Sequence, residues 1–89
     1  MQAKQLKALK KQAFDLKPVV LLGQKGLTES VLSAIDEALT AHELIKIKLA
    51  GLTRDEYAAP IDTILTHCQA ELVSRIGRVL TIYRARPEE

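Results

Sequence analysis

The sequence contains few of the residues that build metal, redox and disulfide sites. Cys68 is the single cysteine among 89 residues, so no disulfide can form within the chain and a cysteine-rich zinc site is excluded. The two histidines, His42 and His67, are isolated in the sequence and do not predict a metal site. We therefore expect no cofactor and no metal, and we interpret Cys68 as a small buried thiol on a helix.

Long apolar runs and aromatic residues are also scarce. No apolar run approaches the roughly 20 residues that a membrane-spanning helix needs. The basic N-terminus is not followed by the apolar block of a secretory signal, so we expect a cytoplasmic protein without membrane contact. Aromatic residues make up 3% of the chain, which argues against a sheet that stacks nucleic-acid bases on aromatic side chains.

The length and the charge distribution narrow the possibilities further. The chain is long enough for one compact domain, which we place at residues 1–86, with residues 87–89 as a frayed tail. Residues 1–26 hold six lysines and one aspartate, a net charge of +5, whereas residues 27–89 hold seven basic and ten acidic residues, a net charge of −3. A basic end on a mildly acidic domain is typical of a protein that binds a polyanion.

The basic end is predicted to be an amphipathic helix over residues 3–14. Three apolar residues share one face at helical spacing: Leu6, Leu9 and Ala13. Three lysines with the same spacing lie on the opposite face: Lys4, Lys7 and Lys11. The helix should therefore pack one side against the protein and present a row of ammonium groups on the other.

The middle of the chain is predicted to form a strand, a turn, a helix and a second strand. The residue before Pro18 is disfavoured in a helix, and residues 19–22 form an apolar, β-branched run that we interpret as a buried strand. Residues 23–26 form a glycine-bounded turn, and Thr28 is a good N-cap for a helix that ends near residues 41–42. Residues 44–49 alternate, with Lys46 and Lys48 on one face of the strand.

The last third predicts a helix followed by a hairpin. Residues 53–56 match a capping box for a helix that runs to about residue 70, and Pro60 is expected to kink that helix or to restart it. Residues 71–76 and 79–84 predict two strands, joined by Gly77 and Arg78. The order helix-strand-helix-strand-helix-strand-strand predicts an α+β fold with a mixed four-stranded sheet.

The turn at residues 23–26 is the strongest candidate for a binding site. Glycine permits positive φ and close approach to the backbone, and the start of the following helix offers N–H groups and a partial positive charge. These features suit an anion, and a GXXG loop of this kind clamps nucleic-acid backbones in KH domains. The same two glycines could serve turn geometry alone. The turn lacks the further residues of an ATPase phosphate loop and of a dinucleotide fingerprint.

Four segments form a combined motif, and they are residues 21–28 (LLGQKGLT), 42–48 (HELIKIK), 71–73 (ELV) and 76–84 (IGRVLTIYR). Together they resemble the CRM domain, named for chloroplast RNA splicing and ribosome maturation, and its stand-alone bacterial form, the YhbY family. The match runs from end to end of the chain. Gln24 and Pro60 depart from the commonest pattern.

The resemblance implies an RNA-binding module that is not an enzyme. It implies a fold similar to the C-terminal domain of translation initiation factor three, and association with ribosomal RNA in the precursor of the large ribosomal subunit. The family's loop maps onto Gly23, Gln24, Lys25 and Gly26. Its basic residues map onto the first helix, with Lys4, Lys7 and Lys11, and onto Lys46 and Lys48.

Alternatives remain open for the basic residues. The lysine helix could bind an acidic protein surface, with the glycine turn purely structural, and Lys46 and Lys48 could protect a sheet edge. Arg78 and Arg84 are as compatible with plain surface charge as with RNA contact. No nucleophile–base pair or small-molecule site is apparent. We expect a monomer that binds phosphates and RNA shape in a salt-sensitive manner.

Overall fold

The structure is a computed structural model, and it describes residues 2–23, 26–50 and 58–85. Its helices and strands follow one another in the predicted order: α1 (Ala3–Ala13), β1 (Val20–Leu21), α2 (Glu29–His42), β2 (Leu44–Lys48), α3 (Ala58–Cys68), β3 (Glu71–Ile76) and β4 (Val79–Tyr83). The predicted tail at residues 87–89 lies outside the described residues, and the division of the chain at residue 86 stays a prediction.

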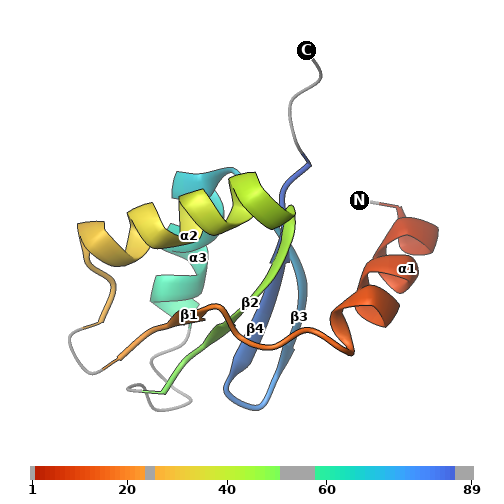
Figure 1. The fold of residues 1–89 in the computed structure, drawn as a ribbon, viewed down its shortest axis with the longest axis horizontal. Coiled ribbons are helices and arrows are strands. Elements are labelled where there is room, and N and C mark those ends of the chain that lie inside the picture. Colours follow the sequence, from red (N-terminus) through yellow and green to blue (C-terminus); the bar gives the residue numbers. More distant parts are fainter. Residues whose placement is uncertain (1, 24–25, 51–57, 86–89) are drawn as a thin grey trace.

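The strands form one mixed sheet in the order β1-β2-β4-β3. The β1 strand is parallel to β2, whereas β2 and β3 both pair antiparallel with β4. Figure 1 shows α2 and α3 together on one side of the sheet, with α1 apart from them beyond the other elements. The predicted α+β class with a mixed four-stranded sheet is therefore confirmed.

The main core lies between the sheet and the pair α2 and α3. Alternate residues of β2 and β4 point into it, because successive side chains of a strand face opposite sides of the sheet. They meet apolar residues of the two helices, and the fully buried members are Leu22, Ile35, Leu39, Ile45, Ile47, Leu49, Ile64, Cys68, Leu80 and Ile82. The predicted burial of Cys68 on a helix is confirmed.

A second, smaller cluster joins α1 to the opposite face of the sheet. It contains Leu9 and Ala13 from the predicted apolar face of α1, together with Leu44 and Val73 from β2 and β3. Leu44 precedes Ile45, which points into the main core, so Leu44 must point to the other face. The helix therefore covers the end of this face at Leu44 and Val73, whereas Lys48 at the other end is exposed.

The first strand is shorter and more exposed than the sequence suggested. Only Val20 and Leu21 form β1, which lies at an edge of the sheet. Leu22 is fully buried, but Val19 is 55% exposed and Leu21 is 59% exposed. The prediction of a buried strand over residues 19–22 is therefore wrong for Val19 and Leu21, whereas Leu22 is buried and Val20 packs against the main core.

Two residues singled out in the sequence, Thr28 and Pro60, lie beside or within the two later helices. Thr28 caps α2, and its hydroxyl accepts a hydrogen bond of 3.2 Å from the backbone N–H of Val31. The described part of α3 begins at Ala58 and includes Pro60. The predicted kink or restart of the helix at Pro60 stays a prediction. The predicted capping box at residues 53–56 lies outside the described residues.

The terminal hairpin forms as predicted. Ile76 pairs with Val79, and Gly77 adopts a φ of 59° in the two-residue turn between them. A register shift between Leu72 and Ser74 leaves Val73 as an extra residue that reaches the cluster under α1. The hairpin thus supplies β3, the edge strand opposite β1, and Val73, one of the residues that pack with α1.

Candidate nucleic-acid interface

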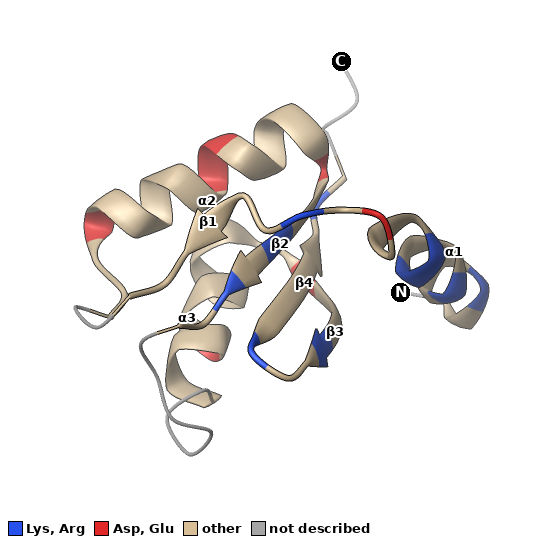
Figure 2. Cartoon of the chain, turned by 60° about the horizontal axis from the view of Figure 1, so that its bottom comes forward, with Lys and Arg blue, Asp and Glu red and all other residues tan. Residues whose placement is uncertain are grey.

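Positive and negative side chains lie on different parts of the fold. Figure 2 shows lysine and arginine on α1, on the segment that follows it, on β2 and on the β3–β4 hairpin, whereas most acidic residues lie on α2 and α3. The asymmetry predicted along the chain is therefore also an asymmetry in space. A polyanion would be attracted to the side of the sheet that carries α1.

The lysine row of α1 points into solvent. Lys4, Lys7 and Lys11 are all exposed, because the opposite side of the helix packs Leu9 and Ala13 against the sheet. None of the three forms an ion pair with another described residue. The predicted two-faced helix is confirmed, and its ammonium groups are available to a ligand.

Lys46 and Lys48 lie on the same sheet face as Leu44, where Lys46 is half-buried and Lys48 is exposed. They alternate with Ile45 and Ile47, which point into the main core, so their side chains project away from α2 and α3. The β2 strand is internal, between β1 and β4. The two lysines therefore do not protect a sheet edge, and that alternative is removed.

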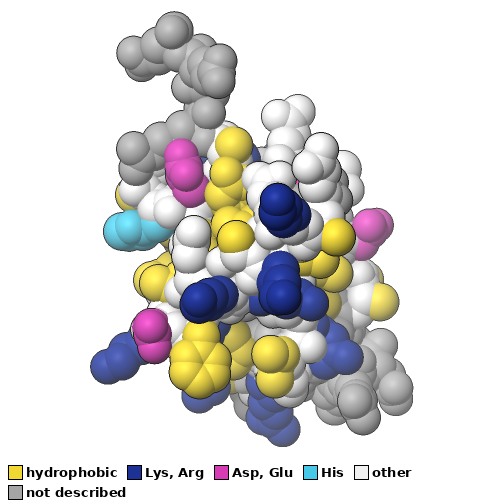
Figure 3. All heavy atoms as spheres, turned by 90° about the vertical axis from the view of Figure 1, so that its right-hand side faces the viewer, with side chains coloured by type: hydrophobic (Ala, Val, Ile, Leu, Met, Phe, Trp, Pro, Cys, Tyr) yellow, Lys and Arg dark blue, Asp and Glu magenta, His cyan; other side chains and the backbone are white. Residues whose placement is uncertain are grey.

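These positions define one surface, which we call the basic sheet face. It consists of the α1 lysine row, Lys4, Lys7 and Lys11, together with Lys46 and Lys48 on the sheet face that α1 partly covers. Figure 3 shows basic side chains gathered on the α1 side of the molecule, with apolar side chains exposed between them. This mixture of charge and apolar surface distinguishes it from the acidic helical side.

The glycine turn is described only at its two ends, since Gln24 and Lys25 lie outside the described residues. The N–H of Gly26 donates a hydrogen bond of 3.0 Å to the carbonyl oxygen of Gly23, so this N–H is already used within the turn. Gly26 has a φ of 74°, a conformation that strains any other residue. Gly26 is thus required by turn geometry.

Gly23, unlike Gly26, is not required by its backbone conformation. Its φ is not in the left-handed range, and a Cβ added there would meet no atom within 4 Å. Neither backbone conformation nor packing in the described residues requires glycine at this position. Gly23 is half-buried, and the space beside it would accept a side chain.

The glycine turn and the α1 lysines lie far apart in the fold. Figure 1 shows the end of β1 and the start of α2 on one side of the molecule, and α1 on the other. Figure 2 shows the basic residues of β2 between these two regions. The predicted binding residues therefore do not form one pocket, and together they outline an extended track.

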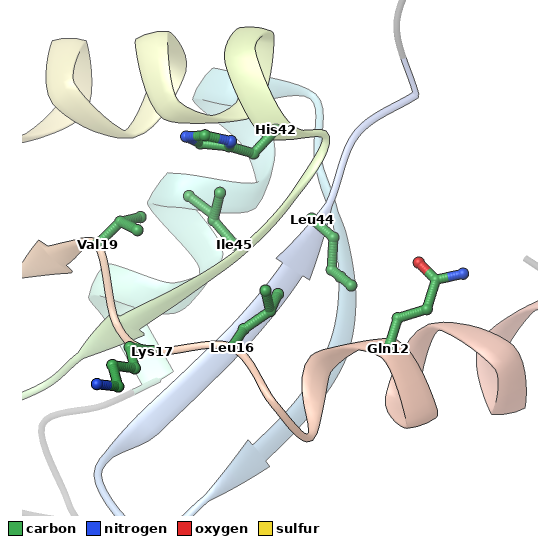
Figure 4. Close-up of a pocket in the computed structure, with 7 residues that line it drawn as sticks. All are labelled: Gln12, Leu16, Lys17, Val19, His42, Leu44 and Ile45. Atoms are coloured by element: carbon green, nitrogen blue, oxygen red, sulfur yellow. The ribbon is translucent and has the colours of Figure 1, made fainter.

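A pocket of about 420 Å³ lies beside this track. It is formed where the segment after α1 passes the end of α2, and its lining residues are Gln12, Leu16, Lys17, Val19, His42, Leu44 and Ile45 (Figure 4). The predicted position of His42 at a helix end is confirmed. Within the described ranges, no group of three or more histidine, cysteine or acidic residues could hold a metal ion.

The sequence did not predict the structural role of Arg84, which forms hydrogen bonds to α2 and to the end of α3. Its Nη1 donates to Asp36 Oδ1 at 2.6 Å and to the carbonyl oxygen of Cys68 at 3.0 Å. Its Nη2 donates to the carbonyl oxygen of Asp36 at 3.0 Å and to Thr40 Oγ1 at 2.8 Å. The guanidinium thus joins the end of β4 to α2 and satisfies the last carbonyl of α3, so Arg84 has a structural role and is not plain surface charge.

Cys68 is expected to react slowly with thiol reagents in the folded protein. Burial raises the pKa of the Cys68 thiol, the Asp36 carboxylate raises it further, and the Arg84 guanidinium opposes them. A thiol whose pKa is higher in the folded than in the unfolded state stabilises the fold at lower pH, and this contribution is lost as the pH rises through the folded pKa. We expect native modification at neutral pH to be on the order of 100-fold slower than modification in urea.

Ellman's reagent measures this difference, and a Thr66→Cys, Cys68→Ala variant is the matched control because Thr66 is exposed on the same helix. The control thiol should react at similar rates with and without urea. Equal rates for the native and unfolded wild-type thiol would contradict the buried placement.

The fold and this surface define a small α+β domain with one basic sheet face and one acidic helical side. None of its described helices has the length and apolarity to span a membrane. The model of the CRS1 / YhbY (CRM) domain matches residues 1–84, and the chain belongs to this family.

Relatives and a solved structure agree with this assignment. The chain is 44% identical to an RNA-binding protein of Haemophilus influenzae over 88 residues, which cover 99% of this chain and 89% of the relative. It is 40% identical to a "probable RNA-binding protein" of Pseudomonas aeruginosa, with 98% and 81% covered. A Staphylococcus aureus protein described as a candidate RNA-binding protein has a solution structure that superimposes with a TM-score of 0.84 at 30% identity, with 99% and 92% covered.

Proposed function

We propose that this protein binds RNA through its basic sheet face and its glycine turn, and that it does so as a cytoplasmic monomer without enzymatic activity. The observation that carries the proposal is the position of Lys46 and Lys48 on an internal strand, facing away from the core beside the α1 lysine row. Placing two ammonium groups on a sheet face adds no packing to the core, but it suits a chain of phosphates. The names of the relatives support RNA as that polyanion.

We further propose that the RNA is ribosomal RNA in the precursor of the large subunit, and that binding assists assembly of that subunit. The family resemblance supports this choice of target. The contacts would be made by Gly23, Gln24, Lys25 and Gly26 at one end of the track, by Lys46 and Lys48 in the middle, and by Lys4, Lys7 and Lys11 at the other end. An extended track of this kind contacts phosphates and therefore gives strong salt dependence.

The role of the glycine turn is tested by a Gly23→Asp, Lys25→Glu double variant. We expect its affinity for ribosomal RNA fragments and for precursor large subunits to fall at least about 10-fold, because two carboxylates would face the phosphates. The open space around Gly23 should let the variant fold normally. Fluorescence anisotropy measures the affinity and circular dichroism checks the fold.

The matched control carries the same change in net charge on the acidic side. A Ser33→Glu, Ala34→Glu, Thr66→Glu variant changes three exposed positions of α2 and α3 and should bind nearly as well as the wild type. If the folded double variant also binds like the wild type, the turn is structural. A protein-interaction module is the second candidate, and partners that co-purify after nuclease treatment would favour it.

A further inference from the structure

Phe14 is the most exposed large apolar side chain among the described residues, with 85% of its surface accessible. It caps the C-terminus of α1 in a helical conformation, with its N–H donating to the carbonyl oxygen of Lys11 at 3.3 Å. The position is therefore defined by the helix. Phe14 belongs to neither apolar cluster of the fold.

The position of Phe14 around the axis of α1 explains why its ring faces solvent. Leu9 and Ala13 lie on the packed side of the helix, and the next residue is rotated by about 100° away from that side. A polar side chain at position 14 would leave both clusters unchanged. The phenylalanine adds nothing to folding there, and an exposed apolar group of this size indicates a binding contact.

Phe14 is also the start of an apolar strip. Six large apolar side chains are exposed among the described residues, and four of them lie between the end of α1 and the end of β1: Phe14, Leu16, Val19 and Leu21. The strip leads from α1 toward the strand that precedes the glycine turn. It therefore runs along the same track as the basic residues.

The charges around Phe14 indicate the chemistry of its ligand. Lys10 and Lys11 lie one turn before it on α1, and Lys17 follows it in the connecting segment, with Asp15 as the single acid. A flat apolar ring among ammonium groups suits a nucleotide, whose base stacks on the ring while its phosphate meets the lysines. A membrane surface fits less well, because the apolar side of α1 is already buried against the sheet.

We propose that Phe14 stacks on an unpaired base of the bound RNA, so that the protein prefers RNA with a single-stranded segment at the α1 end of the track. The inference rests on the proposed RNA-binding function and adds a preference to it. It differs from recognition on an aromatic sheet, because one ring at a helix end takes one base. The lysines on either side hold the flanking phosphates.

The chain contains no tryptophan, so a Phe14→Trp variant carries a single fluorescent reporter at the proposed stacking position. We expect its emission to be quenched by a hairpin RNA with an unpaired tail, and to change little with a blunt duplex of equal length. An Ala34→Trp variant places the reporter on the exposed side of α2 and should not respond to either RNA.

Affinity gives a second measurement. A Phe14→Ala variant should bind the tailed hairpin about 10-fold more weakly and the blunt duplex as well as the wild type does, since the stacking of one base is removed. Phe14→Tyr should restore the preference for the tail, whereas Phe14→Leu should not. Because the side chain is exposed, circular dichroism and the unfolding midpoint should be the same for all variants.

The outcomes separate this inference from the proposed function. If the wild type binds neither RNA, the RNA-binding proposal fails together with the stacking contact. If the wild type binds RNA but Phe14→Ala retains full affinity and the Trp emission is unchanged, stacking alone is overturned. A Trp emission that responds to anionic vesicles and not to RNA would overturn it in favour of a membrane contact.

Discussion

Replacing Lys46 and Lys48 by glutamine is expected to weaken RNA binding by about 10- to 100-fold and to lower the salt slope of the affinity by about two. Each lysine that neutralises a phosphate releases about one counterion, so the change in slope reports how many phosphates the two side chains neutralise. Glutamine keeps most of the side-chain stem and removes the charge. Fluorescence anisotropy at several salt concentrations gives the affinity and the slope together.

A Ser33→Glu, Thr66→Glu variant is the matched control for these lysines. It changes the net charge by the same amount at exposed positions of α2 and α3, on the acidic side of the fold. Its affinity should fall only slightly and its salt slope should stay that of the wild type. Equal reductions of affinity in the two variants would show that overall charge, and not the basic sheet face, governs binding.

Replacing Arg84 by alanine is expected to lower the free energy of unfolding by about 2–3 kcal/mol, because charge-assisted hydrogen bonds to both helices are removed. The bonds to the carbonyl oxygens of Cys68 and Asp36 and to the Thr40 hydroxyl carry most of this effect. The ion pair contributes less, because the Asp36 side chain is 54% exposed and solvent screens the attraction. For a domain of this size, the midpoint of thermal unfolding should fall by about 10–20 °C.

Two further variants identify the cause of this destabilisation. Arg84→Lys keeps the charge but cannot donate in several directions at once, so it should recover less than half of the stability. Arg78→Ala, at an exposed position of the hairpin, should change the unfolding free energy by less than about 0.5 kcal/mol. A folded Arg84→Ala variant with reduced RNA affinity at low temperature would contradict the purely structural role.

Local patterns in the sequence determined which elements form and the position of several of their ends. The repeat of Leu9 and Ala13 marked the packed side of α1, and Thr28 marked the start of α2. Gly77 marked the hairpin. Each of these features depends on residues within a few positions of one another, so the period of apolar residues and the chemistry of caps and turns suffice to predict them.

The candidate site was predicted in part for the same reason. Alternation along residues 44–49 placed Lys46 and Lys48 on one strand face, and helical spacing placed Lys4, Lys7 and Lys11 in one row. Neither pattern says whether a strand is internal or what covers its other face. The exposure of Phe14 was missed as well, because an apolar residue at the end of a helix can pack against any neighbouring segment, and only the tertiary structure shows that none of the described ones covers it.

What the sequence by itself determined is therefore the order of the elements, the two faces of each and the family. The tertiary structure decided the rest: that β1 is an exposed edge strand, that β2 is internal, and that α1 covers the end of a sheet face at Leu44 and Val73. It also decided that Arg84 joins a residue 48 positions away in the sequence. These features depend on which distant segments pair, and short-range periodicity holds no information about such pairing.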